Sequence, residues 1–184
     1  MTDYFAECVN FVLKREGGYV NDPLDKGGET NMGITAGTLK RALDAGLPVH
    51  KDVKDITKMD ALLIYRAFYW EPYAYKTSLF PACLVLLDIC VNHGAGGMAT
   101  IAQRAANALS WRLDVDGKYG AKTAQSIEKL SAANSFTYTE ELLRQRKDYY
   151  DRIIKKTPSQ ARFKNGWYNR IRELATVAGV KSPV

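Results

Sequence analysis

The residue best placed to do chemistry is Glu16, which stands directly before Gly17, Gly18 and Tyr19. A carboxylate at the end of a short helix suits a general acid when glycines let the backbone double back over it. Such an acid must keep its proton near neutral pH, and proteins usually achieve this by placing the carboxyl in an apolar pocket. Val12 and Leu13 lie one helical turn before Glu16, so we expect its side chain to be partly buried.

The segment from Arg15 to Thr35, REGGYVNDPLDKGGETNMGIT, resembles the signature of glycoside hydrolase family 108. That family consists of N-acetylmuramidases, or lysozymes, with an EGGY motif near the N-terminus. The resemblance implies a mainly α, lysozyme-like fold and cleavage of the β-1,4 bond between N-acetylmuramic acid and N-acetylglucosamine in peptidoglycan. It also implies that Glu16, the glutamate of EGGY, is the essential acid, and that the reaction needs no metal and no cofactor.

Glycoside hydrolysis needs a second group that activates water or stabilises the oxocarbenium-like transition state. The loop after Glu16 offers the carboxylates Asp22, Asp25 and Glu29, with the Thr30 hydroxyl as a holder of water. The spacing of Glu16, Asp25 and Thr30 is similar, more loosely, to the Glu–Asp–Thr arrangement of phage-type lysozymes, although the Thr falls one residue early. We therefore predict Asp25 and Thr30 as further catalytic residues. Aspartates in such a loop are equally typical of turns in which they bond their own backbone.

Aromatic residues supply the candidates for sugar binding, because sugars stack their C–H faces on rings. Tyr19, Tyr69, Trp70 and Tyr73 are the predicted substrate-binding residues of the first half. The stretch from Tyr69 to Tyr75 contains Glu71 and Pro72 and is too polar to lie wholly in a core. Aromatic residues at helical spacing are otherwise most often core residues.

The second half contains the segment 115–123, VDGKYGAKT, which resembles the DGxxGxxT turn of peptidoglycan-binding modules. Asp116 and Tyr119 are the binding residues that this resemblance implies. We predict a glycosidase region at 1–91 and a peptidoglycan-binding-like helical region at 92–184, packed into one compact unit. His93, near the seam at 92–97, is expected to be a structural residue at a helix end, although a catalytic base is the alternative.

The hydrophobic periodicity predicts helices almost throughout. They are expected at about 3–15, 35–46, from Thr57 onward, 82–92, 98–109, 138–156 and 160–177. Residues 19–34 are rich in turn formers and indicate a hairpin or an Ω-like loop. Thr57 with Asp60, and Thr137 with Glu140, have the spacing of capping boxes.

Composition indicates a soluble globular chain, with 46% hydrophobic and 25% charged residues among 184. No run of about 18 apolar residues occurs, so we expect no stable membrane insertion. Cys8, Cys83 and Cys90 have apolar neighbours and lack metal-ligand spacing, which predicts free buried thiols. The net charge of +6 comes from residues 140–184, which hold 11 Lys and Arg against 5 Asp and Glu.

This basic part favours a polyanionic partner such as the cell wall. We expect the protein to be a monomer, and we expect its partner to be the glycan strands of peptidoglycan. Nucleic acid is not expected, because no recognisable reading motif is present. The N-terminus lacks a signal-peptide pattern, so we expect synthesis in the cytoplasm and action on the wall after release by a holin or a secretion route. A lytic transglycosylase and a non-catalytic wall-binding or secretion-accessory protein remain alternatives.

Overall fold

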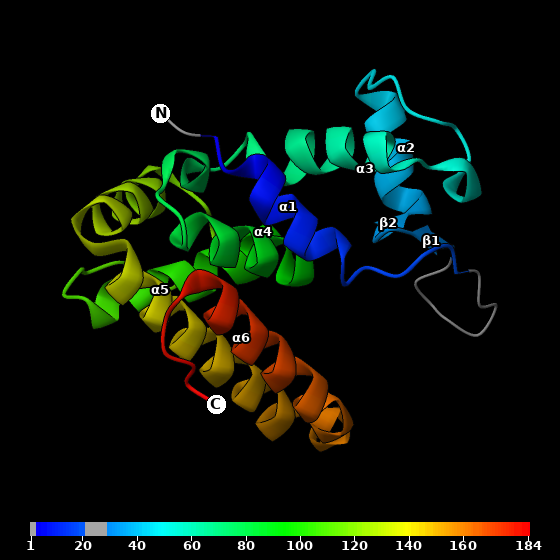
Figure 1. Ribbon diagram of the computed structural model, residues 1–184. Helices are drawn as coiled ribbons and strands as arrows, with labels where there is room; N and C mark the ends of the chain where they lie inside the picture. The colour runs from blue at the N-terminus through cyan, green and yellow to red at the C-terminus, as the bar shows by residue number, and fades with distance from the viewer. Residues whose placement is uncertain (1–2, 21–28) are drawn as a thin grey trace. The chain divides into compact units, whose positions relative to one another are not determined.

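The computed structural model describes residues 3–20 and 29–184, and it is mainly helical with one small hairpin (Figure 1). This confirms the predicted mainly α fold class with a hairpin segment after the first helix. The chain forms two compact units. The N-terminal unit spans Phe5–Pro72, and the C-terminal unit spans Tyr73–Val184 together with the first residues of the chain up to Tyr4.

The N-terminal unit begins with a short amphipathic helix. Its elements are α1 (Phe5–Leu13), β1 (Thr30–Asn31), β2 (Ile34–Thr35), α2 (Ala36–Asp44), the 3-10 turn η1 (Val53–Asp55), α3 (Lys58–Tyr65) and the π-helical turn η2 (Arg66–Trp70). Helix α1 buries Phe5, Cys8, Val9 and Val12. These positions are separated by three, one and three residues, so they form a single apolar stripe along the helix.

The hairpin of the N-terminal unit has a two-residue turn. Strands β1 and β2 pair antiparallel, with Asn31 opposite Ile34. The turn residues Met32 and Gly33 both have positive φ, 48° and 75°, as a type I′ turn requires. Thr35 then caps α2 by accepting a hydrogen bond from the Thr38 amide.

The capping box predicted at Thr57 and Asp60 is confirmed at the start of α3. Asp60 is only 4% exposed, and it accepts hydrogen bonds from Thr57 and contacts His50 Nδ1 at 2.7 Å. Burial by itself would raise the pKa of Asp60, but the hydrogen bonds from Thr57 and the interaction with His50 bring it below its ordinary value.

The C-terminal unit is a bundle of long helices. Its elements are η3 (Ala74–Thr77), α4 (Ala82–Ala108), α5 (Ala121–Lys156), η4 (Pro158–Phe163) and α6 (Lys164–Ala178). Helix α5 packs along both α4 and α6 (Figure 1). Gly179 closes α6 in the left-handed conformation, with φ 66° and ψ 33°.

Two of these helices are interrupted. Gly94 leaves helical geometry inside α4, with φ 68° and ψ 177°, which corresponds to the predicted helix end at 92–94. Asn134 interrupts α5, with φ −161° and ψ 93°. The Asn134 side chain accepts a hydrogen bond from the Thr137 amide, so Asn134 is the cap of the second segment. The capping box predicted at Thr137 is therefore wrong, because the helix begins three residues earlier.

The three cysteines are free and buried, as predicted. By length and mean hydropathy α4 would be able to cross a membrane, but 67% of its most apolar window is buried within the protein. That burial is typical of a core helix. Among the described residues no group of three or more His, Cys, Asp or Glu side chains is arranged to hold a metal ion.

Candidate active site

Glu16 lies just after α1, within the turn that ends the helix. Its backbone amide donates to the Val12 carbonyl at 3.2 Å, and the Arg15 amide donates to the same carbonyl at 2.9 Å. The helical hydrogen bonding therefore continues to Glu16 before the chain reverses. The Glu16 side chain is half-buried, in accordance with its position one turn after Val12.

The chain on either side of residues 21–28 runs together as an antiparallel pair. Val20 and Thr30 exchange backbone hydrogen bonds of 2.8 and 2.9 Å, and the Met32 amide donates to the Gly17 carbonyl at 3.1 Å. These bonds place the glycines that follow Glu16 beside β1. The sequence prediction that the backbone doubles back near Glu16 is confirmed in this form.

Gly33 brings the hairpin turn against the Glu16 carboxylate. A Cβ atom built at Gly33 would lie 2.9 Å from Glu16 Oε2 and 2.5 Å from Tyr65 Oη. Both distances are shorter than real Cβ contacts, so a side chain at Gly33 would have to displace these two oxygens. The φ of 75° at Gly33 independently favours glycine. Glu16, Gly33 and Tyr65 therefore form one contact group, which we call the acid cluster.

Tyr65 is a member of this cluster that sequence reasoning missed. Its helical spacing in α3 indicates a core residue, and it is indeed only 1% exposed. Its hydroxyl, however, donates to the Met32 carbonyl at 3.2 Å and so reaches the hairpin turn. A buried tyrosine needs a partner for its hydroxyl. That requirement is the one sequence signal that pointed to a polar neighbour.

The hairpin is fixed in place by Asn31, which is 7% exposed. Its side-chain amide lies 3.1, 3.4 and 3.3 Å from the carbonyl oxygens of Val53, Lys54 and Ile56. An amide group has two N–H donors, so these three acceptors share them. The contacts hold β1 against η1 and thereby fix the turn that touches Glu16.

Of the two further catalytic residues predicted from the sequence, Asp25 and Thr30, the structure describes only Thr30. Asp25 lies outside the described residues, as does Asp22. Thr30 lies on β1, half-buried, opposite Thr35. Glu29 accepts a hydrogen bond of 2.9 Å from the Tyr19 hydroxyl. The structure thus places Thr30 two residues before the turn of the acid cluster, and the roles of Asp25 and Thr30 stay predictions.

The aromatic candidates of the N-terminal unit differ in exposure. Tyr19 is 46% exposed, and Tyr69 is half-buried with its ring 5.4 Å from that of Tyr65. Trp70 is only 2% exposed and packs edge-on against Phe5 at 5.6 Å. The expectation that Trp70 contacts a sugar is therefore corrected: the indole fills the core, because helical spacing turns it inward.

The remaining aromatic candidates, Tyr73 and Tyr119, belong to the C-terminal unit and contact each other edge-on at 5.0 Å. Tyr73 also stacks on Tyr75, with the ring centroids 5.5 Å apart. Burial raises the pKa of the Cys90 thiol to about 11, although its interactions with Tyr75 and Tyr73 oppose the shift. Cys90 is therefore protonated and structural near neutral pH.

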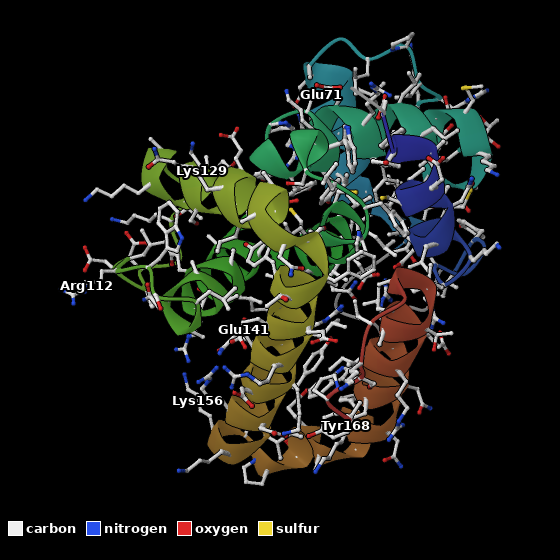
Figure 2. All side chains as sticks on the ribbon, turned by 60° about the vertical axis from the view of Figure 1, so that its left-hand side comes forward. Glu71, Arg112, Lys129, Glu141, Lys156 and Tyr168 are labelled. Carbon is white, nitrogen blue, oxygen red and sulfur yellow. The ribbon has the colours of Figure 1, made fainter. Side chains whose placement is uncertain are left out.

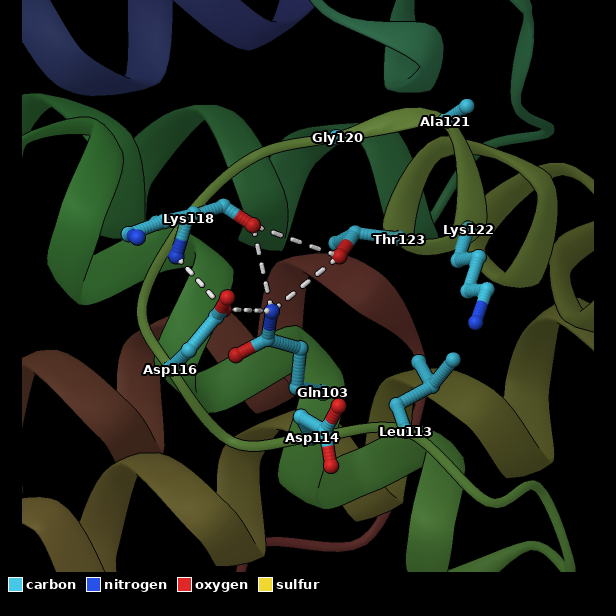
Figure 3. Close-up of a pocket in the computed structure, with 9 residues that line it drawn as sticks. All are labelled: Gln103, Leu113, Asp114, Asp116, Lys118, Gly120, Ala121, Lys122 and Thr123. Carbon is cyan, nitrogen blue, oxygen red and sulfur yellow. Dashed lines mark hydrogen bonds between the residues drawn. The ribbon is translucent and has the colours of Figure 1, made fainter.

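The turn at Asp116 and Gly117, which we call the DG turn, was predicted as a binding element, and a buried glutamine organises it (Figure 3). Gln103 is 2% exposed, and its Nε2 lies 2.8 Å from Asp116 Oδ1, 3.1 Å from the Lys118 carbonyl oxygen and 3.2 Å from Thr123 Oγ1. These three acceptors share the two N–H donors of the amide. Its Oε1 accepts from the Gly117 amide at 3.1 Å. The hydrogen bonds from the Lys118 amide and from Gln103 hold the pKa of Asp116 below its ordinary value. Sequence reasoning found the turn but missed Gln103.

The buried charges of the C-terminal unit have a structural role. Asp88 is fully buried, and it accepts hydrogen bonds from Arg146 Nη1 at 2.6 Å and Arg170 Nη2 at 2.7 Å. His93 lies between the rings of Tyr149 and Tyr150, at 5.1 and 5.2 Å. Burial lowers the pKa of His93 to about 3, so its imidazole stays neutral at physiological pH. This agrees with the structural role expected for His93.

Five of the eleven cationic residues of the basic C-terminal part lie close together in the sequence. Between residues 152 and 164 the chain holds five cationic residues and no acidic one. These five residues, which we call the cationic tip, are Arg152, Lys155, Lys156, Arg162 and Lys164. All five are exposed where α5 passes into η4 and α6, at the end marked by Lys156 and Tyr168 in Figure 2.

The chain has a lysozyme-like fold, mainly α with one small hairpin, and the half-buried Glu16 carboxylate follows its first helix. Residues 9–94 match a family model described as Glycosyl hydrolase 108, and residues 98–172 match one described as Predicted Peptidoglycan domain. The solved structure of Brucella abortus SagA is similar, with a TM-score of 0.72 and 31% sequence identity. That similarity covers 98% of this chain and 96% of SagA. No curated protein matches the chain significantly.

The chain belongs to the glycosyl hydrolase 108 family, and its two matched segments make it a peptidoglycan hydrolase. The boundary between the two matches lies at 94–98, near the interruption of α4 at Gly94. The boundary between the compact units lies earlier, at 72–73. The first part of α4 thus matches the glycosidase family but packs in the C-terminal unit. The functional division into 1–91 and 92–184 stays a prediction.

Proposed function

We propose that this protein is an N-acetylmuramidase and that Glu16 is its general acid. Glu16 would protonate the oxygen that joins N-acetylmuramic acid to N-acetylglucosamine, while the second group acts at the anomeric carbon. The observation that carries this proposal is the acid cluster, in which the Glu16 carboxylate is half-buried beside Gly33 and the Tyr65 hydroxyl. A general acid must be held in a fixed position beside the reacting group, and the packing of Glu16 against the hairpin turn supplies such a position.

Asp25, with Thr30, is the second catalytic group in this proposal. The support is positional, because Thr30 pairs with Val20 and so continues the strand that ends at the acid cluster. In the sequence, Asp25 stands between Val20 and Thr30. One carboxylate on each side of the scissile bond is the arrangement that glycoside hydrolysis requires.

The cationic tip would hold the enzyme on the acidic cell wall. Its five positive charges are exposed and have no acidic residue among them in the sequence. Peptidoglycan carries peptide carboxylates, which attract such a surface. We propose that the protein acts on the wall as a monomer after synthesis in the cytoplasm, reaching the wall through a holin or a secretion route.

The test is digestion of purified peptidoglycan by wild type, Glu16→Gln and Glu7→Gln, with the released muropeptides weighed by mass spectrometry. Glu7 is an exposed carboxylate on the same helix, so its variant is the matched control. Reducing muramic-acid ends from wild type and Glu7→Gln, but not from Glu16→Gln, are the expected result. Anhydromuramic ends would identify a lytic transglycosylase instead. Release of no product by any of the three proteins would leave a wall-binding protein without catalysis.

A further inference from the structure

A pocket of about 250 Å³ lies between the DG turn and the first turn of α5 (Figure 3). Its floor is rigid, because the buried side chain of Gln103 holds Asp116, Lys118 and Thr123 together. A frame that is fixed before binding costs little ordering entropy when a ligand enters. The backbone of the pocket is therefore held in place by Gln103, while exposed charged side chains line its opening to solvent.

The pocket carries opposite charges that do not neutralise each other. Asp114 and Lys122 both line it, and both are exposed. Among the described residues neither side chain forms an ion pair, with the other or with a third residue. A carboxylate and an ammonium group that share one pocket without pairing are available to a ligand with charges of both signs.

The start of α5 adds a second place for a negative group. Gly120 precedes the helix and has no side chain to cap the first free amides. The positive end of the helix dipole points to the same region, and Lys122 lies in this first turn. Carboxylate binding is therefore expected on the side of Lys122, and amine binding on the side of Asp114.

We propose that this pocket binds the peptide stem of peptidoglycan and not its sugars. The inference rests on the proposed function, and it assigns the substrate contact of the C-terminal unit. Stem peptides carry free carboxylates and, where they contain a diamino acid, a free amine, which match Lys122 and Asp114. The glycan lacks such a pair of charges. Sugar recognition would also call for an aromatic ring, and no aromatic residue occurs among the described residues that line the pocket.

The arrangement gives Asp116 a positioning role. Its Oδ1 already accepts hydrogen bonds from Gln103 and from the Lys118 amide, at 2.8 and 2.9 Å. Asp114 is the carboxylate that meets the ligand. This differs from the sequence interpretation, in which the DG motif itself supplies the binding residue.

The test uses the full-length protein and three probes: a stem tripeptide that ends in diaminopimelic acid, the same peptide with its side-chain amine acetylated, and chitotriose. Affinity is measured by calorimetry, and the site is located by NMR amide shifts. The free tripeptide should bind and shift the amides of Gln103 and Lys122. Acetylation should weaken binding about tenfold, because one charge-assisted contact is lost.

Variants separate this pocket from other charged sites. Asp114→Asn and Lys122→Gln should each raise the Kd of the tripeptide about tenfold. Glu128→Gln and Lys129→Gln change equally exposed charges further along α5 and should leave the Kd unchanged. Unchanged affinity in Asp114→Asn and Lys122→Gln would overturn the proposal, and so would shifts of the pocket amides by chitotriose.

This result is independent of the digestion experiment. If the tripeptide binds as described while wild type releases no muropeptide, the hydrolase mechanism fails and the stem pocket stands. If wild type releases reducing ends but the tripeptide does not bind at millimolar concentration, the stem pocket fails and the mechanism stands.

Discussion

The hairpin turn of the N-terminal unit and the DG turn of the C-terminal unit are built in the same way, but different side chains pack against their glycines. Each has a glycine with positive φ, 75° at Gly33 and 69° at Gly117. Each is fixed by a buried amide side chain, Asn31 in the first and Gln103 in the second.

The difference lies in what occupies the space that a side chain on the glycine would take. At Gly33 that space holds the Glu16 carboxylate and the Tyr65 hydroxyl. At Gly117 the nearest atom is the neutral hydroxyl of Thr100, 2.9 Å from the position of a Cβ. The same backbone device therefore presents an acid in one unit and stiffens the frame of a pocket in the other. It follows that a glycine turn indicates function only together with the side chain packed against it.

The largest expected effect tests the acid half of this comparison. Glu16→Gln removes the transferable proton and should lower kcat by about 10²–10⁴-fold, the usual contribution of a general acid. Its melting temperature should stay close to that of the wild type, because Gln keeps the size of the side chain. The rate is measured by release of reducing ends from peptidoglycan. Loss of activity by unfolding would appear as a changed circular dichroism spectrum and would contradict this expectation.

The second effect concerns the buried ion pair of Asp88 and Arg146, which stabilises the fold and has no part in the proposed chemistry. Asp88→Asn leaves the fully buried Arg146 uncompensated and should lower the free energy of unfolding by about 3–5 kcal/mol. Asp148→Asn is the control, because Asp148 is 37% exposed and its contact with Arg144 is 3.6 Å. A surface pair of this kind contributes about 0–1 kcal/mol. Urea denaturation measures both variants, and equal losses would contradict a special role for Asp88.

The buried carboxylate of Asp88 also predicts that the free energy of unfolding depends on pH. Burial by itself would raise the pKa of Asp88, but Arg146 and Arg170 bring it below its ordinary value. The ionised carboxylate therefore stabilises the protein above the pKa of the unfolded state, about 4, and this stability is lost as the pH falls through the lower folded pKa. Unfolding free energies measured between pH 5 and pH 2 should fall more steeply for wild type than for Asp88→Asn.

A third variant pair sharpens the comparison between glycines. Gly33→Ala and Gly46→Ala both place a side chain at positive φ, 75° and 76°, and each should cost about 1–2 kcal/mol of stability. Only the Cβ at Gly33 would displace Glu16, since no atom lies within 4 Å of a Cβ at Gly46. Gly33→Ala should therefore lose about 10–100-fold in kcat by misplacing the acid. Equal activity of the two variants in the digestion assay would show that Gly33 does not position the Glu16 carboxylate for catalysis.

The smallest effect tests the cationic tip. A Lys155→Gln, Lys156→Gln, Arg162→Gln triple variant should bind less well to intact wall sacculi in low salt. The difference should disappear in 1 M NaCl, where the screening length is about 3 Å. The control replaces Lys14, Lys51 and Lys58, three exposed lysines of the N-terminal unit, by Gln. Equal retention of both triple variants in a sedimentation assay would assign wall retention to net charge alone.

The sequence by itself determined the local features of this protein. The mainly α class, the stripe of α1, the cap at Thr57 and the interruption near Gly94 followed from residue spacing, because contacts between residues a few positions apart leave a periodic pattern in the sequence. The family followed from the resemblance of the EGGY segment to that of known members. Glu16 stood out because its glycines follow it directly.

Only the tertiary structure decided which distant groups meet. It brought Tyr65 to the hairpin turn 33 residues earlier, Arg170 to Asp88 across 82 residues, and Gln103 to the DG turn. It also turned Trp70 into the core and placed the cap of the second α5 segment at Asn134. A buried polar group must find a partner, but which partner it finds depends on how whole helices pack. No spacing along the chain records that choice.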